Sequence, residues 1–368
     1  METKQFERGP DLPPPITEVG VIGWLRRNLF SSWMNTILTV ITAYLIWLMI
    51  PPLIDWALLD ADWNGTSRED CTSDGACWVF VSVRFNQFMY GFYPEAQQWR
   101  IDLIYGTLFL LMIPLFLKTF PWKTWLGGFI IFVYPFIAYG FLDGSWFGLE
   151  VIETTKWGGL SLTLILAGIG CVAALPLGVV LALGRRATNM PIVKSICVVF
   201  IEFWRGVPLI TVLFMSSVML PLFLPEGVTF DKLARALIGI TLFQSAYMAE
   251  VIRGGLQAIP KGQYEAADAL GLGYWKKTGL IILPQALKIV IPGVVNTFIA
   301  LIKDTTLVLI IGLFELLGMI QNALNDPNWL GFSTEGYAFT ALVFWIICFS
   351  LSRYSMHIER KLHTGHKR

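Results

Sequence analysis

The chain has 368 residues, of which 55% are hydrophobic and 14% are charged, and its mean hydropathy is +0.62. This composition argues against soluble domains and predicts an all-α polytopic membrane protein with about eight transmembrane helices. The net charge of +1 indicates no particular partner, and the sequence has no basic block of the kind that binds nucleic acid.

The first part of the chain is expected to hold a tail and three spans. Residues 1–32 are largely polar and form a predicted cytoplasmic tail, and residues 33–153 hold three expected transmembrane helices. The first apolar run starts near Met34 and is too long for the apolar core of a signal peptide, so we expect it to be retained. An insertion at about 55–100 is acidic and contains no lysine, which favours the periplasmic side.

Residues 154–353 are expected to hold five further helices, followed by a cytoplasmic tail at 354–368. Lysine and arginine gather in alternate loops, so the positive-inside rule places both termini in the cytoplasm of a bacterial inner-membrane protein. One expected helix, 192–224, exceeds the ~20 residues that a bilayer requires and contains Pro208, so we expect it to be kinked. The eight expected helices cover about 34–53, 101–117, 127–142, 157–183, 192–224, 233–256, 288–317 and 337–351.

The five cysteines and three histidines do not indicate a metal site. Cys71 and Cys77 lie in the insertion, where an oxidising compartment permits a disulfide, and both a disulfide and two free thiols remain open. The other three cysteines sit in apolar runs and are expected to pack in the core. The histidines all follow the last expected helix, without the spacing of a metal-binding group: His357, His363 and His366.

The loop at 260–286 separates two apolar runs and holds three lysines and two acidic residues. Because an ionised side chain at the bilayer centre costs about 2.5–3.5 kcal/mol, this loop must lie outside the membrane, and its lysines favour the cytoplasmic side. Pro260 suits the start of a short helix, and Gly271 and Gly273 suit its end. One side of that helix is expected to admit a close approach by another protein, and it presents Tyr264, Ala267 and Leu270.

This loop resembles a known family. Its fixed positions match the EAA loop of binding-protein-dependent (MetI-like) ABC importer permeases, which docks as a coupling helix in a groove of an ATPase subunit; they are Glu265, Ala266, Ala267, Gly271, Ile281, Leu283 and Pro284. The resemblance implies an ATPase-coupling role for Glu265, Ala266, Ala267, Leu270 and Gly271. The alternative is a capped, basic cytoplasmic loop of an unrelated polytopic protein.

Two further stretches carry polar groups at membrane depth, where such groups are functional candidates. Glu202 and Arg205, three apart, can pair on one helix face within EFWRGVPL, which resembles a stretch of the polar amino-acid permeases. They could line the transport path or pin a kinked helix. Glu250 and Arg253 repeat the spacing near a helix end, and Gln244 lies deeper, where it could bind substrate or join helices.

The stretch Lys303-Asp304-Thr305-Thr306 resembles the KDTSL pattern of amino-acid permeases. An amino-acid substrate carries an ammonium group that Asp304 could bind, and a carboxylate that a broken helix could receive with free backbone N–H groups. Thr305 and Thr306 could add hydroxyl groups. The alternative is a structural hinge in which Lys303 and Asp304 pair with neighbouring helices.

The sequence lacks a P-loop, a nucleophile elbow and a zinc-protease motif, so we expect a transport subunit rather than an enzyme. With no catalytic residue and no metal or cofactor expected in this chain, ATP and Mg²⁺ would be bound by a separate ATPase. An ion-coupled secondary carrier using Asp304 and Glu202 is the alternative function.

Together, the stretches of resemblance cover about 154–352 and identify the chain as similar to the M-type permease of the general L-amino-acid importers. The resemblance implies a five-helix core preceded by three extra helices, with L-amino acids of broad range as substrates. It also implies a related Q-type permease as heterodimer partner, two ATPase subunits and a periplasmic binding protein, within the lipid bilayer and without nucleic acid.

Overall fold

A computed structural model describes residues 20–117, 119–225 and 230–362. The predicted tails therefore lie partly outside the described residues, at 1–19 and 363–368. The described residues form helices and no strands, which confirms the all-α prediction, and the chain divides into two compact units, Met1–Val79 and Phe80–Arg368. The α-helices are α1 (Gly20–Asn28), α2 (Trp33–Ile54), α3 (Val79–Tyr90), α4 (Trp99–Phe116), α5 (Lys123–Phe132), α6 (Tyr134–Asp143), α7 (Gly159–Arg185), α8 (Pro191–Gly206), α9 (Leu209–Phe214), α10 (Lys232–Ala258), α11 (Lys261–Ala269), α12 (Tyr274–Lys277), α13 (Leu283–Asp304), α14 (Leu316–Leu324) and α15 (Ser333–Leu362).

The first unit consists of α1, α2 and a loop closed by a disulfide. Ser32 caps α2, and its hydroxyl accepts a hydrogen bond from the backbone N–H of Asn35 at 3.2 Å. No residue of α2 is buried, as expected for an apolar helix that faces lipid on all sides. Cys71 and Cys77 form a disulfide in the following loop, which resolves the alternative that the sequence left open.

The described residues contain five to seven membrane-spanning candidates, against eight expected helices. By length and composition, five helical segments of the described residues can span a membrane: Trp33–Leu59, Glu95–Phe116, Gly159–Arg185, Tyr274–Ile311 and Ser333–Leu362. Two bent pairs raise this number to seven: α5 with α6, bent by 41°, and α8 with Leu209–Phe223, bent by 102°. The eighth expected helix corresponds to α10, which is 27 residues long but more polar.

Helices α7, α10 and α13 pack against one another and form the centre of the second unit. Small residues allow the close approach, as is usual between helices in membranes. A Cβ atom added to Gly178 on α7 would lie 2.7 Å from Met248 on α10, and one added to Gly255 on α10 would lie 2.5 Å from Val290 on α13. Helix α15 packs along α13, and α8 packs on both α7 and α10.

Helices α8 and α13 are each interrupted, and the segments that follow the two interruptions pack against each other. Val207 is extended because it precedes Pro208, so α8 ends and α9 begins in a new direction. This confirms the expected kink. Helix α13 passes at Thr305 into a 3-10 helix, which Gly312 ends with a φ of +70°. Helix α9 packs against that 3-10 helix.

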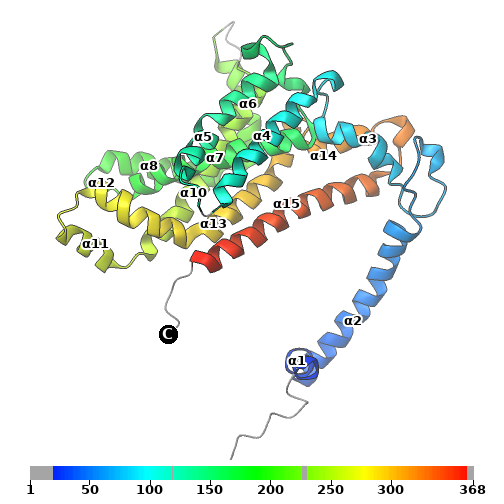
Figure 1. Cartoon of the computed structure of the whole chain (residues 1–368), viewed down its shortest axis with the longest axis horizontal. Coiled ribbons are helices and arrows are strands. Elements are labelled where there is room, and N and C mark those ends of the chain that lie inside the picture. Colours follow the sequence, from blue (N-terminus) through cyan, green and yellow to red (C-terminus); the bar gives the residue numbers. More distant parts are fainter. Residues whose placement is uncertain (1–19, 118, 226–229, 363–368) are drawn as a thin grey trace, which may run out of the picture. The chain divides into compact units, whose positions relative to one another are not determined.

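Figure 1 shows α11 and α12 at one end of the second unit and α14 at the other. We call these the α11 end and the α14 end. At the α14 end, Phe80 on α3 packs on Trp329, with ring centroids 5.4 Å apart. Backbones also touch there: a Cβ on Gly159 would lie 2.4 Å from the carbonyl oxygen of Phe88, and the φ of Gly159 is +64°. Residues 80–100 of the expected insertion therefore belong to the packed core of this unit.

Candidate functional site

The predicted docking residues lie on and just after α11, at the α11 end of the second unit. Glu265 and Ala266 are exposed, and Leu270 keeps 75% of its surface exposed. Ala267, by contrast, is only 1% exposed because it faces this chain's own core. The prediction that Ala267 lies on a surface open to another protein is therefore wrong, and the available surface is that of Glu265, Ala266 and Leu270.

Gly271 ends α11 by adopting a φ of +70°, which only glycine adopts without strain. The backbone N–H of Leu272 donates to the carbonyl of Ala267 at 3.2 Å, and that of Gly271 donates to Asp268 at 2.9 Å. These bonds satisfy carbonyls that the end of the helix leaves free. Lys277 on α12 then forms an ion pair with Asp268, so α12 folds back on α11.

Tyr264 anchors α11 to the helices of the core. Its hydroxyl donates to the carbonyl oxygen of Leu256 at 3.0 Å and accepts from the Arg186 guanidinium at 3.1 Å. Arg186 also donates to the carbonyl of Leu256 at 2.9 Å, and its guanidinium carbon lies 5.6 Å from the centre of the Tyr264 ring. Sequence reasoning gave Arg186 no role beyond a basic residue at the end of a span.

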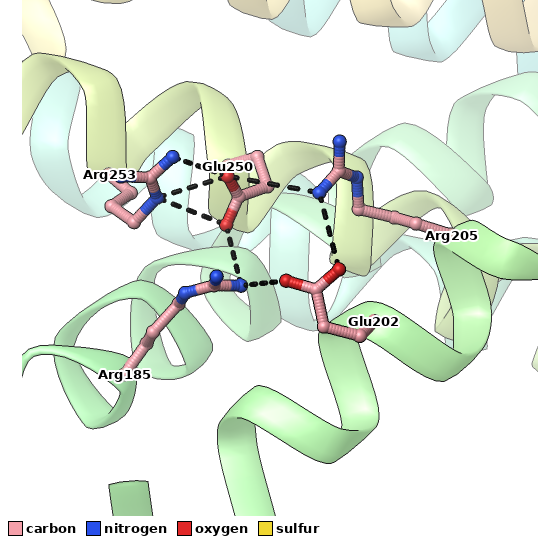
Figure 2. A network of polar contacts seen from close by, with 5 residues as sticks. All are labelled: Arg185, Glu202, Arg205, Glu250 and Arg253. Carbon is pink, nitrogen blue, oxygen red and sulfur yellow. Dashed lines mark hydrogen bonds and ion pairs between the residues drawn. The ribbon is translucent and has the colours of Figure 1, made fainter. Parts of the chain in front are cut away.

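Figure 2 shows a cluster of three arginines and two glutamates, one of which, Arg185, directly precedes Arg186 in the chain. Arg185, the last residue of α7, reaches Glu202 on α8 at 2.7 Å and Glu250 on α10 at 3.0 Å. Arg253 lies 2.7 Å from Glu250, one turn away on α10. Arg205 lies 3.9 Å from both glutamates. The cluster therefore ties three helices together near the α11 end.

The expected pairs within single helices are only part of this cluster. The pairing of Glu250 with Arg253 is observed, but Arg205 is a distant partner of Glu202, and Arg185 is the close one. Arg185 was missed because its partners lie 17 and 65 residues further along the chain. One signal could have indicated a role for it. Arg185 and Arg186 both follow the same apolar run, although a single charge there would satisfy the positive-inside rule.

The other predicted substrate residues lie elsewhere. Gln244 is buried on α10, and its amide donates to the carbonyl oxygen of Thr297 on α13 at 2.7 Å. Thr305 is fully buried and donates to the carbonyl of Ile302 at 2.7 Å, and Thr306 donates to that of Lys303 at 2.8 Å. These three side chains bind backbone carbonyls, so each has a structural function.

Asp304 differs from these three residues. It is half-buried at the end of α13, where the chain changes to the 3-10 helix that packs on α9. Its carboxylate takes part in no hydrogen bond or ion pair with the residues that the structure describes. Among the described residues, neither Gln244 nor Glu202 forms a hydrogen bond or ion pair with it; Gln244 bonds to Thr297 and Glu202 pairs with Arg185. In the described parts of the chain, no group of three His, Cys, Asp or Glu side chains could hold a metal ion.

Comparison with known proteins identifies the family. The model of the binding-protein-dependent transport system inner membrane component matches residues 174–364, which is half of the chain. The chain belongs to this family. It is therefore a multi-pass inner-membrane transport subunit and not an enzyme, which confirms the resemblance that the EAA loop indicated. In ABC transport systems of this kind the ATPase is a separate subunit.

Three relatives show how far the similarity extends. The inner membrane amino-acid ABC transporter permease protein YhdY of Escherichia coli is 57% identical, over 99% of each chain. The glutamate/glutamine/aspartate/asparagine transport system permease protein BztC of Rhodobacter capsulatus is 42% identical, over 96% of each. The probable glutamine ABC transporter permease protein GlnP of Bacillus subtilis is 34% identical, but the match covers 55% of this chain and 91% of that relative. The shorter relative therefore lacks a counterpart for much of this chain.

Proposed function

We propose that this chain is the M-type permease subunit of an importer for L-amino acids, driven by ATP hydrolysis on separate subunits. The observation that carries the proposal is α11: a helix with the EAA pattern that exposes Glu265 and Leu270 and is fixed from behind by Tyr264. An exposed leucine beside a carboxylate, on a helix anchored to the spans, suits docking into a groove of an ATPase. The names of YhdY and BztC support amino acids as the substrates.

The proposal includes the partners. Two ATPase subunits would bind ATP and Mg²⁺, and the single α11 of this chain would dock to one of them. A related Q-type permease would therefore supply the docking helix for the other. A periplasmic binding protein would deliver substrate to the opposite face, where the insertion at 55–100 is a candidate contact. In this arrangement α11 and both termini lie in the cytoplasm, as the distribution of lysine and arginine favours.

We propose Asp304 as a contact for the substrate ammonium group. Its free carboxylate lies at the end of α13, and the 3-10 helix that follows packs against α9, the segment beyond the break in α8. Transporters use such interrupted helices for substrate sites at membrane depth. Thr305 and Thr306 hold the backbone of this break through their hydroxyl groups. Gln244 joins α10 to α13, and Glu202 belongs to the arginine–glutamate cluster. We therefore propose that Gln244 and Glu202 stabilise the helices around the transport path and do not contact the substrate.

Transport would follow alternating access. Closure of the ATPase dimer on ATP would move the docking helices, and the spans would reopen toward the periplasm to accept substrate. The test is purification of the tagged chain from its own cells, identification of co-purified proteins by mass spectrometry, and reconstitution of the complex in liposomes. We expect an ATPase and a second permease, and uptake of labelled L-glutamate, L-glutamine, L-arginine or L-leucine only with ATP. Uptake by the chain alone, driven by an ion gradient, would instead establish an ion-coupled carrier.

A further inference from the structure

Two adjacent arginines at the end of α7 contact the docking helix on one side and the interrupted helix on the other. Arg186 contacts Tyr264 on α11, and Arg185 contacts Glu202 on α8. We propose that Arg185 and Arg186 are positioning residues that transmit the movement of α11 to the break between α8 and α9. This inference rests on the proposed docking of α11 to an ATPase.

The link at α11 is short and specific. The Arg186 guanidinium donates to the hydroxyl of Tyr264 and to the carbonyl of Leu256, and the same hydroxyl donates to the same carbonyl. Three groups from α7, α10 and α11 thus share one set of hydrogen bonds, two of which are charge-assisted and therefore strong. A displacement of α11 would change both hydrogen bonds of the Tyr264 hydroxyl, one of which comes from Arg186.

The link at α8 joins three helices through one side chain. Arg185 is 23% exposed and lies within 3.0 Å of carboxylate oxygens on Glu202 and Glu250, so its planar guanidinium bridges α8 and α10. The end of α7 is also held close to α8, because Gly184 lets the Cys197 side chain approach: a Cβ on Gly184 would lie 2.4 Å from that sulfur. Movement of Arg185 is therefore transmitted to α8 by contact as well as by charge.

The break in α8 lies one turn beyond Glu202. Arg205, the penultimate residue of α8, is 3.9 Å from Glu202 and from Glu250, and its guanidinium carbon lies 5.8 Å from the ring of Tyr247 on α10. Val207 and Pro208 follow at once, and there the chain turns by 102°. The path from α11 to the turn thus consists of contiguous contacts. It ends at the helix that meets the 3-10 segment following Asp304.

The cluster provides its own matched control. Arg253 contributes the same charge and the same kind of ion pair to Glu250, but its bonds stay within α10 and join no two helices. Arg185→Gln and Arg253→Gln therefore remove the same charge from the same cluster, and only the first removes a connection between helices. If the cluster served only to balance charge or to stabilise α10, the two variants would behave alike.

The experiment compares these variants in the complete transporter, purified with its ATPase, partner permease and binding protein and reconstituted in liposomes. We expect Arg185→Gln to retain ATPase subunits and basal ATP hydrolysis but to lose at least ~10-fold in the hydrolysis stimulated by loaded binding protein. Arg253→Gln should stay within about twofold of the wild type. Arg185→Lys, which keeps the charge but has no planar fork, should fall between them. Equal stimulation in Arg185→Gln and Arg253→Gln would overturn the proposal, as would loss of ATPase subunits from Arg185→Gln alone.

A second set of variants tests the link at Tyr264, and two of them, Tyr264→Phe and Tyr274→Phe, remove only a hydroxyl group. Tyr264→Phe should lower stimulated hydrolysis, and Tyr264→Phe with Arg186→Gln should be no worse than Arg186→Gln alone, because both changes remove the same link. Tyr274→Phe, at an exposed tyrosine of α12, is the control and should have no effect. Additive losses would overturn the link at Tyr264. A wild-type chain that captures no ATPase would refute the proposed function itself, which is a different outcome.

Discussion

Most of the ion pairs that the structure describes in the second unit lie at the α11 end, whereas at the α14 end Arg84 pairs with Asp326. At the α14 end the contacts are buried and close: Gly159 lies against the backbone of Phe88, and Arg100 is 1% exposed with its guanidinium on the carbonyl of Glu150 at 2.9 Å. At the α11 end, ion pairs between partly exposed side chains, such as Arg185 with Glu202, accompany close packing such as that of Gly184 on Cys197. Close-packed backbone has few alternative arrangements, whereas partly exposed ion pairs can exchange partners at little cost. The comparison indicates a close-packed α14 end and, at the α11 end, an arginine–glutamate cluster whose ion pairs can rearrange.

The largest expected effect comes from adding bulk at the fixed end. Gly159→Val would place a β-branched side chain at a φ of +64°, against a carbonyl oxygen 2.4 Å from its Cβ. We expect a loss of about 3 kcal/mol or more, from backbone strain and overpacking together, and little folded protein. Thermal unfolding of the purified chain in detergent measures this. Gly168→Ala, whose Cβ would meet nothing within 4 Å, is the control, and equal damage by both changes would contradict a specifically packed end.

A change on the surface of the α11 end should spare the fold and abolish coupling. Glu265 is exposed, so Glu265→Lys removes no buried contact, but it reverses the charge that the ATPase groove would meet. We expect an unchanged unfolding temperature and transport reduced to background, measured as ATP-dependent uptake in liposomes. The same reversal at Glu359, an exposed glutamate of α15, should leave uptake intact. Normal uptake by Glu265→Lys would refute the docking role.

A third change tests the region between the two ends. Asp304→Asn keeps the size of the side chain and removes the charge that we assign to the substrate ammonium group. Losing a hydrogen bond to a charged group costs about 1.5–3 kcal/mol, which corresponds to a roughly 10- to 100-fold weaker response to substrate. Substrate-stimulated ATP hydrolysis across a panel of amino acids measures this. Unchanged kinetics for all of them would remove Asp304 from the substrate site and leave it a hinge residue.

The smallest effect on transport is expected outside the second unit. The Cys71–Cys77 disulfide closes a short loop in the first unit, so Cys71→Ser should destabilise that loop by about 2 kcal/mol and lower uptake only slightly. Faster cleavage of the loop by an added protease measures the effect. Because the two thiols form one bond, Cys71→Ser, Cys77→Ser and the double variant should behave identically. If the double variant were more labile than either single variant, the two cysteines would act separately.

Much of the fold could be predicted because its determinants are local. Most of the apolar runs are long enough to cross a bilayer, so most of the spans follow from composition and length. Pro208 lacks an amide hydrogen and restricts Val207, so the break in α8 is set by two neighbouring residues. Gly271 is the residue that a left-handed helix end requires. The docking loop could likewise be located, because its charges exclude it from the membrane.

The sequence by itself determined most of the spans, the interruption of α8 and the position of the charged loop that contains α11, since each depends on residues close together in the chain. Only the tertiary structure decided that Ala267 faces inward and that Arg185 joins Glu202 to Glu250. Those outcomes depend on which helix faces α7 and α11, and on small residues such as Gly184 that set how closely the helices approach. A hydrophobic pattern specifies that a helix is buried in the membrane, but its partners are fixed by the packing of all the helices together.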